Sequence, residues 1–513
     1  MHTNRGDQRL MNTDSDLPND DLYTEKNGEM SEILEGPLFT SDHIASKVSA
    51  NDEKTSSKEN QNIKQNPKGH GDKNERALTF EGLFSAVYLV ITQTVIFTSI
   101  ALYFGLNEVW LGIASSFPMA FQVFQIFAPA LIERIPKRKY LLMFFNSGRF
   151  LWILLIPFLF SSNRSPKIFV LVFAISQIFA AFSGNIWLSI VSDTIKPERR
   201  GKYLGLRNFF VSLATLVSFY LFSLIVDNVK RPYNYMLVIV GAMVASLFSV
   251  VSLKPLEEKR AKTTGSLNDL RLVTKDKNFM KLCMAYFAWN FVILIASPFF
   301  AYHQLNNIKL PVTYISYSSI AASLLSMVFY TLWGRLSDEF GHKSVLIVGM
   351  SIVSITPAIW ILMNERDWIL AMILDAILSG VGWAAVNLAF VTLPLEAASS
   401  SSPMYFAVFS ALGGLGGTIG SIIGGFVAQF FNSFDFYIGT FHVYGLQILF
   451  LIESVLRYMT IPLFAKVSSK KYVSPATMFT NVISVLSGRH AMRINEENRT
   501  DLIIGRKRID RWW

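Results

Sequence analysis

Apolar stretches as long as a membrane-crossing helix recur along most of this 513-residue chain. A helix needs ~20 mostly apolar residues to cross the ~30 Å of hydrocarbon in a bilayer, and an open strand there would leave backbone groups unpaired. The stretches therefore predict an all-α polytopic membrane protein with twelve transmembrane helices. The expected spans are 82–104, 109–131, 140–160, 167–192, 207–229, 233–253, 279–302, 311–334, 344–363, 368–395, 404–430 and 441–465.

The composition supports this class and argues against others. Only 16% of the residues are charged, and the 42 phenylalanines outnumber the 37 acidic residues, which is more apolar surface than a soluble domain of this length can bury. The net charge of +10 comes from Lys and Arg in short loops and tails, a pattern of membrane topology rather than of nucleic-acid binding. The single cysteine, Cys283, excludes an intrachain disulfide and a thiolate metal site, so neither a metal nor another cofactor is expected.

The polar breaks divide the chain into two halves of six spans each. The polar segment 1–78 contains few aromatic residues and is expected to be a disordered tail without a cleavable signal peptide. The longest break between spans, the basic loop 254–278, separates a first half, 79–253, from a second half, 279–465, and a basic tail, 466–513, follows. Lys and Arg are enriched in loops on the side of the central loop, so both termini are expected to be cytoplasmic, in an inner or plasma membrane.

Two correspondences indicate that the halves are repeats. The break after the eighth span, GRLSDEFGHK (334–343), matches the break after the second span, PALIERIPKRK (129–139), and a second match links the fourth span to the tenth. The paired positions are Leu131 with Leu336, Glu133 with Asp338, Pro136 with Gly341, Asn185 with Asn387 and Tyr203 with Tyr405. Internal repeats of this kind are typical of transporters built from duplicated halves.

These motifs resemble the major facilitator superfamily. The segment Gly334-x-Leu336-x-Asp338-x-x-Gly341-His342-Lys343 is similar to that family's G-x-L-x-D-x-x-G-R-K loop, whereas prolines replace both glycines in the first-half copy. The resemblance, which covers roughly residues 80–465, implies a secondary active transporter that moves a small organic solute by alternating access. It further implies a monomeric permease or symporter with a proton or a cation as the candidate coupling ion. The family's antiporter glycine-proline motif is missing from the fifth span.

The repeated loop has a chemistry that suits a gate. Glycines allow a tight turn between helix ends, and a carboxylate such as Asp338 can satisfy the open N–H groups at the start of a neighbouring helix. Basic side chains there can pair with carboxylates or lipid phosphate. An ion-paired loop without a gating role is the alternative. The expected gating residues are Glu133, Arg134, Gly334, Arg335, Asp338, Gly341 and Lys343.

Four ionisable residues are singled out well inside the expected spans, where a charge is costly and usually has a partner or a function. Glu453 and Arg457 are four residues apart and are expected to pair on one helix face. Asp375 is expected either to bind the coupling ion or to be held by neighbouring hydroxyls and amides. Arg149 is a candidate for binding an anionic substrate, although the third helix is usually less central in the family.

The resemblance places the first, fourth, seventh and tenth spans around a central cavity. Amides and indoles on these spans suit a hydrogen-bonding organic solute, but amides also join helices to one another. The expected cavity residues are Gln93, Thr94, Asn185, Trp187, Trp289, Asn290, Asp375, Trp383 and Asn387. Glycines of the eleventh span, 413–424, are expected to allow close helix packing.

Two functions from other classes compete with transport. The seven histidines are scattered and no carboxylate pair lies in the spans, so an enzyme is not expected. No Walker-type segment is present, which disfavours ATP-driven transport by this chain alone. A transporter-like receptor or scaffold without flux stays open. The expected partners are a small-molecule substrate and membrane lipid, with an anionic lipid surface suited to the basic C-terminal tail and no nucleic acid.

Overall fold

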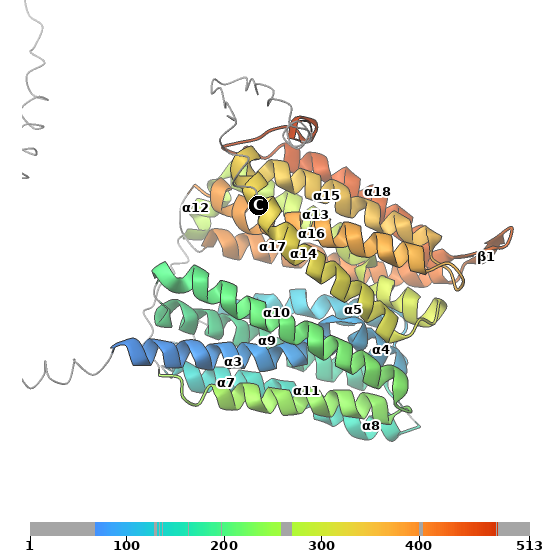
Figure 1. Cartoon of the computed structure of the whole chain (residues 1–513), viewed down its shortest axis with the longest axis horizontal. Helices are drawn as coiled ribbons and strands as arrows, with labels where there is room; N and C mark the ends of the chain where they lie inside the picture. Colours follow the sequence, from blue (N-terminus) through green and yellow to red (C-terminus); the bar gives the residue numbers. More distant parts are fainter. Residues whose placement is uncertain are drawn as a thin grey trace, which may run out of the picture. The chain divides into compact units, whose positions relative to one another are not determined.

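A computed structural model describes residues 67–480 apart from 128–130, 133, 136, 163, 196, 258–268, 400–403 and 479. All but the first of these residues belong to one compact unit, Lys68–Trp513. The elements are α3 (Pro67–Gln93), α4 (Val95–Tyr103), α5 (Glu108–Ala120), η2 (Phe121–Phe127), α7 (Arg138–Ser147), η3 (Gly148–Leu155), α8 (Ile156–Phe160), α9 (Pro166–Thr194), α10 (Pro197–Asn228), α11 (Tyr233–Ser252), α12 (Asp269–Lys275), α13 (Lys277–Tyr302), η4 (His303–Asn307), α14 (Val312–Phe340), α15 (His342–Ile359), η5 (Trp360–Leu362), α16 (Ile369–Ala397), α17 (Met404–Asn432), β1 (Asp435–Ile438), β2 (Phe441–Tyr444) and α18 (Gly445–Ala465) (Figure 1).

The predicted all-α membrane fold is confirmed. Within the described residues, ten helices are long and apolar enough to cross a membrane, and the pair formed by α3 and α4, bent by 52°, counts as an eleventh. The remaining predicted span, 109–131, corresponds to the short helix α5 and the 3-10 segment η2, and its last residues lie among those not described. The predicted count of twelve therefore depends on how this irregular segment is classed.

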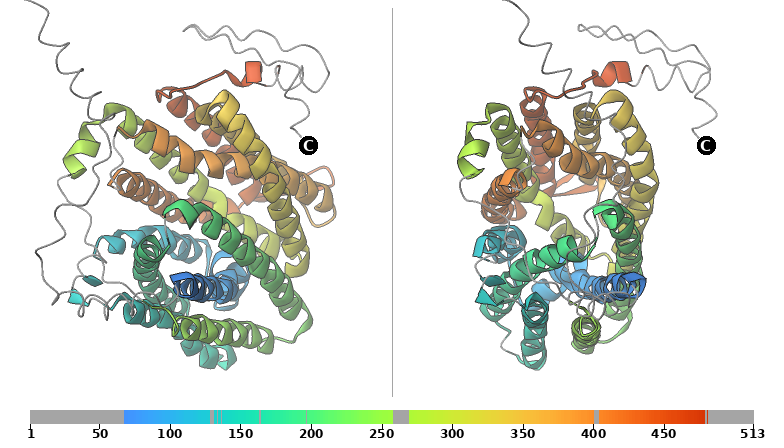
Figure 2. Two further views of the ribbon diagram at one scale, coloured as in Figure 1. Left: turned by 60° about the vertical axis from the view of Figure 1, so that its left-hand side comes forward. Right: turned by 90° about the vertical axis from the view of Figure 1, so that its left-hand side faces the viewer.

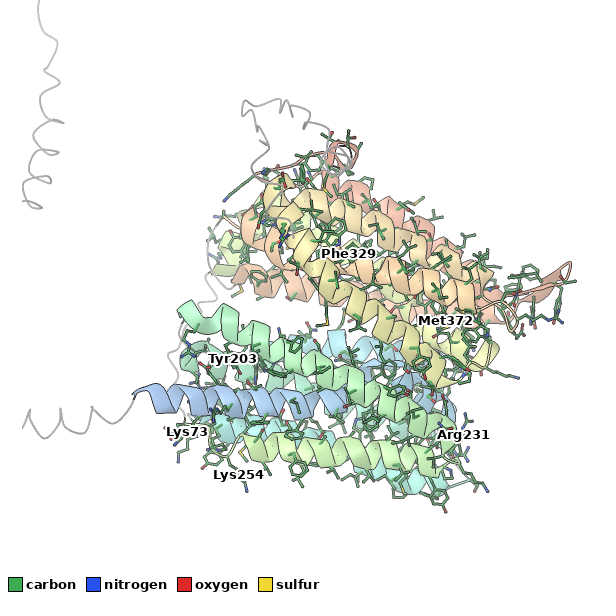
Figure 3. All side chains as sticks on the ribbon, in the orientation of Figure 1. Lys73, Tyr203, Arg231, Lys254, Phe329 and Met372 are labelled. Carbon is green, nitrogen blue, oxygen red and sulfur yellow. The ribbon has the colours of Figure 1, made fainter. Side chains whose placement is uncertain are left out.

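The helices form two groups that follow the chain order. Elements α3–α11 make up the N-terminal half and α13–α18 the C-terminal half (Figure 2). The two ends of the helices differ in what they carry. The hairpin end holds β1 and β2, together with Arg231, and the tail end holds Lys73 and Lys254 (Figure 3).

The buried apolar clusters are distributed unevenly between these ends. One large cluster crosses from half to half near the hairpin end, where it joins Phe104 and Tyr235 to Phe299 and Leu446. Three other clusters each stay within one half. The halves therefore share a core near the hairpin end, while each has its own core toward the tail end.

Glycines of α17 allow its close packing against α13, as the sequence predicted. A Cβ atom at Gly420 or Gly424 would lie 2.1 Å from the carbonyl oxygen of Phe291 or Ile295. Any side chain at these glycines would push the two helices apart. This helix pair is the tightly fitted centre of the C-terminal half.

Two predicted boundaries and the predicted role of one glycine were wrong. Residues 441–444, predicted to begin the last span, form strand β2, which pairs antiparallel with β1. The segment 334–343 is mostly helical, because α14 continues to Phe340. Only Gly341, with a φ of +95°, makes the turn, whereas Gly334 lies inside the helix with open space beside it. The prediction that both glycines serve the turn is therefore corrected to one.

The outer segments differ from the predicted boundaries as well. Helix α3 begins at Pro67, inside the predicted tail 1–78, and α10 begins at Pro197, ten residues before its predicted span. Residues 269–275 of the predicted central loop form helix α12. Residues 1–66 and 481–513, which include the rest of the N-terminal tail and the basic C-terminal end, lie outside the described part.

Candidate functional site

The repeated loops of the two halves carry a matching lysine contact. At the start of α15, the Nζ of Lys343 donates to the carbonyls of Ala465 and Val467 at the end of α18, at 2.6 and 2.8 Å. At the start of α7, the Nζ of Lys139 donates to the carbonyl of Leu256, just after α11, at 3.0 Å. A cation at a helix C-terminus satisfies open carbonyls and the negative end of the helix dipole. In both halves a lysine thus joins the third helix to the end of the sixth.

The other expected gating residues lie near these contacts, but their gating role stays a prediction. The carboxylate of Asp338 is exposed and has no hydrogen bond to a described residue, while its carbonyl accepts one from Lys471 at 3.4 Å. The residues just before α17, 400–403, lie outside the described part. Glu133 also lies outside it, and Arg134 is exposed. Arg335 lies on α14, one turn before its end.

A carboxylate at the hairpin end joins the two halves. Glu108, the first residue of α5, accepts hydrogen bonds on Oε1 from the hydroxyl of Tyr302 and the amide of Asn432, each at 2.6 Å. Glu108 and Tyr302 are buried, which strengthens bonds to a charged acceptor. We call these three residues the latch.

A second carboxylate fastens the opposite side of the same end. Asp227, near the end of α10, accepts from the backbone N–H groups of Val312 and Thr313 at 3.0 and 2.7 Å and from the Thr313 hydroxyl at 2.6 Å. It thereby satisfies the open N-terminus of α14 from the other half. The hydroxyl of Ser421 also donates to the Gly112 carbonyl, at 2.8 Å. These hydrogen bonds between the two halves lie in the hairpin-end part of the helices.

The first helix of the N-terminal half is broken between α3 and α4. Thr94 caps the new helix, since its Oγ1 accepts from the N–H of Ile96 at 3.2 Å while donating to the carbonyl of Val90 at 2.7 Å. Gln93, at the end of α3, is exposed. Broken helices mark binding sites in many transporters because their ends supply backbone polar groups at membrane depth. The sequence selected both residues but not the break, whose only sequence signal is the capping threonine.

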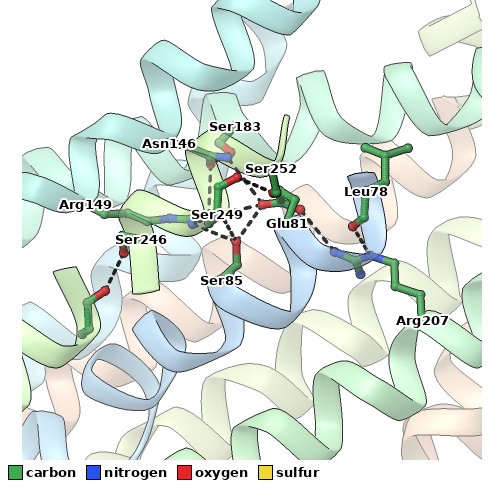
Figure 4. A network of polar contacts seen from close by, with 11 residues as sticks. Leu78, Glu81, Ser85, Asn146, Arg149, Ser183, Arg207, Ser246, Ser249 and Ser252 are labelled. Atoms are coloured by element: carbon green, nitrogen blue, oxygen red, sulfur yellow. Dashed lines mark hydrogen bonds and ion pairs between the residues drawn. The ribbon is translucent and has the colours of Figure 1, made fainter. Parts of the chain in front are cut away.

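A network of charged and polar side chains fills the tail-end part of the N-terminal half (Figure 4). Its centre is Glu81 on α3, which is buried and lies between two arginines. Arg149 approaches one carboxylate oxygen at 3.7 Å and Arg207 approaches the other at 3.5 Å. Ser85 donates a hydrogen bond to Glu81 at 2.7 Å.

Arg149 donates hydrogen bonds to neutral partners on three helices. Its Nη1 donates to the hydroxyls of Ser85 and Ser249 at 2.7 and 3.0 Å, and its Nη2 donates to the Asn146 side chain at 3.0 Å. These donors point inward to the helix contacts rather than to a solute. Arg149 thus joins three helices of its own half, and its predicted role in binding an anionic substrate stays a prediction.

Arg207 is in a different position. Its guanidinium stacks on the ring of Trp187, an expected cavity residue, at 4.3 Å, and its Nε donates to the Leu78 carbonyl at 3.3 Å. The side chain is 14% exposed, and its Nη1 has no hydrogen-bond partner among the described residues. The sequence reasoning missed both Arg207 and Glu81, because each lies at the polar edge of an apolar stretch while the helix extends further.

The C-terminal half contains a balanced charge pair instead. On α18, Arg457 donates to Glu453 at 2.6 and 3.0 Å and to the Val353 carbonyl at 2.7 Å, and both side chains are buried. The Arg457 guanidinium lies 6.0 Å from the ring of Trp383, which in turn lies 6.4 Å from the ring of Trp289. The two expected cavity tryptophans are thus neighbours.

The remaining expected cavity residues have varied surroundings. Asn290 donates to the Tyr286 carbonyl of its own helix at 2.9 Å, Asn185 is half-buried and Asn387 is exposed. Asp375 is half-buried and accepts from Trp360 and Ser379 at 3.2 and 3.3 Å. Both neutral donors match the structural alternative for Asp375, and its coupling role stays a prediction. The described residues contain no group of three or more side chains that could hold a metal ion.

A groove of about 390 Å³ lies elsewhere, between α14 and α16 near the hairpin end. Its lining is almost entirely apolar and includes Leu325, Met372 and Ile377. None of the expected cavity residues lines it. It is therefore not the predicted solute site.

Comparisons with known proteins agree with the architecture. The family model of the Major Facilitator Superfamily matches residues 82–398 and 282–495. Among solved structures, a mutant of the nucleoside transporter NupG is 14% identical, with a TM-score of 0.59, and the match covers 76% of this chain and 98% of that one. A bacterial homolog of the human lysosomal transporter Spinster, in an inward-facing and occupied conformation, is also 14% identical, with a TM-score of 0.57 and coverage of 80% and 99%. No curated protein matches in sequence.

Proposed function

The chain belongs to the major facilitator superfamily, and on that premise we propose that it is a secondary active transporter that moves a small organic solute by alternating access. The observation that carries the proposal is the one-sided contact between the halves. They share an apolar core and carboxylate contacts near the hairpin end, whereas the tail-end clusters each belong to one half. Such an arrangement is one state of two halves that rock about a central site.

The contacts at the hairpin end suit a gate that opens and closes. Glu108 and Asp227 bind through side-chain and backbone hydrogen bonds, which can break and reform as the apolar contacts between the halves at this end separate and close. The bonds lie on two sides of the interface, α5 with α13 and α17 on one side and α10 with α14 on the other. Breaking both sets would let the hairpin ends separate while the tail ends approach.

Flux into vesicles tests the function. The purified protein in proteoliposomes should take up a solute found by thermal-shift screening, since a ligand of the folded state raises its stability. In a Cys283→Ser background, Asp227→Cys together with Thr313→Cys should allow a short bis-maleimide to lock the hairpin end and stop the flux. Treatment of either single variant should leave uptake unchanged. Solute binding without flux would instead support a receptor.

Asp375 is the proposed site of proton or cation coupling. An acidic group at membrane depth can change its charge during the transport cycle, and neutral donors such as Trp360 leave it free to do so. Asp375→Asn should remove the pH dependence of uptake while leaving the pH-independent part. Asp367→Asn, in the exposed hairpin-end loop, is the matched control. Unchanged pH dependence in Asp375→Asn would exclude this role.

The orientation follows from the distribution of positive charge. We place the tail end and both termini in the cytoplasm of a cell with the protein in its inner or plasma membrane, because Lys and Arg are enriched in the tail-end loops. The protein acts as a monomer in this proposal, since each chain contains both halves of the pathway. Protease protection of an epitope at either terminus in oriented vesicles tests the orientation.

A further inference from the structure

The charges in the N-terminal network do not balance. Within the described residues, two guanidinium groups, those of Arg149 and Arg207, share one carboxylate, Glu81, at 3.7 and 3.5 Å. The next ion pair toward the tail end, Arg199 with Glu75, is neutral in itself. An uncompensated charge at membrane depth is costly and marks a functional group. One positive charge in this network thus lacks a counter-ion among the described side chains.

The uncompensated charge falls on Arg207 rather than on Arg149. Arg149 has three neutral acceptors at 2.7–3.0 Å, which spread its charge over Ser85, Ser249 and Asn146. Arg207 has a single backbone acceptor at 3.3 Å, and its Nη1 has no hydrogen bond to a described residue. Its guanidinium is fixed by the Trp187 ring, so its free donors are already oriented.

Unsatisfied donors surround the same residue. Six buried polar side-chain atoms in the described residues have no hydrogen-bond partner, and four of them are donors of the N-terminal half. Two of these four belong to neighbours of Arg207: the Nε1 of Trp187, whose ring it covers, and the hydroxyl of Tyr203, one helical turn earlier on α10. Native proteins rarely leave such groups unpaired, so the indole N–H of Trp187 is an unfilled donor directly beside Arg207.

From the charge and the donors together, we propose that the transported solute carries a carboxylate or phosphate group that binds the guanidinium of Arg207 beside Trp187. This inference rests on the proposed function and narrows its substrate to an organic anion. A guanidinium fork recognises both groups through paired hydrogen bonds, and the indole adds a flat apolar surface for the rest of the solute. Glu81 holds Arg207 at 3.5 Å until the anion replaces it.

Because Glu81 competes with the anion for Arg207, removing its charge should raise the affinity for the anion. In Glu81→Gln the two arginines lose their shared carboxylate, so an anion should bind about tenfold more tightly. In Arg207→Gln the same anion should bind at least about tenfold more weakly, and in Arg207→Lys, which keeps the charge but loses the fork, the loss should be smaller. A network with only a structural role would lose stability in all three variants without gaining affinity.

The experiment is a thermal-shift titration of the full chain in a neutral detergent without lipid. The probes are matched pairs: glycerol 3-phosphate with glycerol, glucose 6-phosphate with glucose, succinate with succinamide and glutamate with glutamine. We expect an anion to raise the unfolding midpoint where its neutral partner does not, and Arg207→Gln to remove the rise. Arg366→Gln, an exposed loop variant, is the control and should respond as the wild type does.

The outcomes separate this inference from the proposed function. Equal responses to both members of each pair, no anion-specific rise in the whole panel, or an undiminished rise in Arg207→Gln would overturn it. A rise produced by phosphatidylglycerol micelles and by none of the soluble anions would also overturn it, because the site would then hold a lipid headgroup. If Arg207→Gln does not fold, the anion affinity of Glu81→Gln tests the inference instead. A gain in affinity supports the inference, and no gain overturns it. Flux of a neutral solute in proteoliposomes would refute the anionic substrate while supporting the proposed transport function. Anion binding without flux would support the anion site while refuting transport.

Discussion

The two halves of the molecule each hold an arginine between their third and sixth helices, Arg457 buried and Arg149 half-buried, but they satisfy it differently. In the C-terminal half, Arg457 pairs with Glu453 at 2.6 Å, one cation with one anion. In the N-terminal half, Arg149 rests on serines and an asparagine, and its carboxylate is shared with Arg207. The C-terminal pair matches one cation with one carboxylate, whereas the described N-terminal network has two cations for one carboxylate.

The largest loss of stability is expected when the balanced pair of Glu453 and Arg457 is broken. Arg457→Met leaves the buried carboxylate of Glu453 without its counter-ion, which should cost ~3–5 kcal/mol of unfolding free energy. Thermal unfolding in detergent measures the loss. The double variant Glu453→Gln with Arg457→Met should recover most of it, because no isolated charge remains. Equal stability of Arg457→Met and the wild type would refute the structural role of the pair.

The equivalent change in the other half should cost less. Arg149→Met removes hydrogen bonds to Ser85, Ser249 and Asn146 but also reduces the excess positive charge, so a loss of ~1–3 kcal/mol is expected. The same unfolding assay compares the two variants directly. A loss of unfolding free energy as large as that of Arg457→Met would mean that the charges of the N-terminal network are balanced as well as those of the C-terminal pair.

The contact between the halves at the hairpin end should weaken when the carboxylate of Glu108 is replaced. Glu108→Gln replaces charged hydrogen bonds to Tyr302 and Asn432 with neutral ones, and ~1.5 kcal/mol of lost bonding shifts the open-to-closed ratio about tenfold. The rate at which a cysteine at Thr313 reacts with a water-soluble maleimide reports the opening. Glu365→Gln is the control, since Glu365 lies at the same end but contacts only His442 and Tyr444 of its own half. Equal rates in the two variants would argue against the latch.

The smallest expected effect concerns the β1–β2 hairpin. Burial alone would lower the pKa of His442, but hydrogen bonds and charges from Asp435 and Glu365 raise it above its usual value. The stabilisation from the protonated ring is thus complete below about pH 6.5, the value of an unperturbed histidine, and is lost as the pH rises through the raised pKa. The protection factors of amides 435–444, which correct the exchange rate for its intrinsic dependence on pH, should be larger near pH 6 than near pH 8, and His442→Gln should abolish the difference. Protection factors in the wild type that do not change with pH would contradict this account.

The sequence predicted the parts of the fold that depend on apolar length. Long apolar stretches identified the helices, and the repeated loops indicated the two halves, because both features are local in the chain. Strand β2 was missed because its residues, FHVY, continue an apolar stretch, and only the pairing with β1 distinguishes them from a helix. The turn at Gly341 was expected, but the helical state of Gly334 depends on how far α14 continues.

The candidate site was predicted less completely, for a physical reason. Trp187 was selected as a cavity residue, yet its stacking partner Arg207 was not, since Arg207 begins an apolar stretch and looks like a residue of the membrane surface. Glu81 was not selected for the same reason, because it lies directly before an apolar stretch. Whether such a residue faces water or a buried network depends on packing between α3, α9 and α10, which no local pattern encodes.

Alternating access is the central claim, and pulsed spin-label distance measurements test it most directly. Two pairs of labels span the halves: Arg231→Cys with Arg366→Cys at the hairpin end, and Lys254→Cys with Lys466→Cys at the tail end, each in a Cys283→Ser background. Weakening the hairpin-end contacts with Glu108→Gln and Asp227→Asn should lengthen the first distance and shorten the second in the same fraction of molecules. Distances that change at one end alone, or that lengthen at both ends, would contradict the claim.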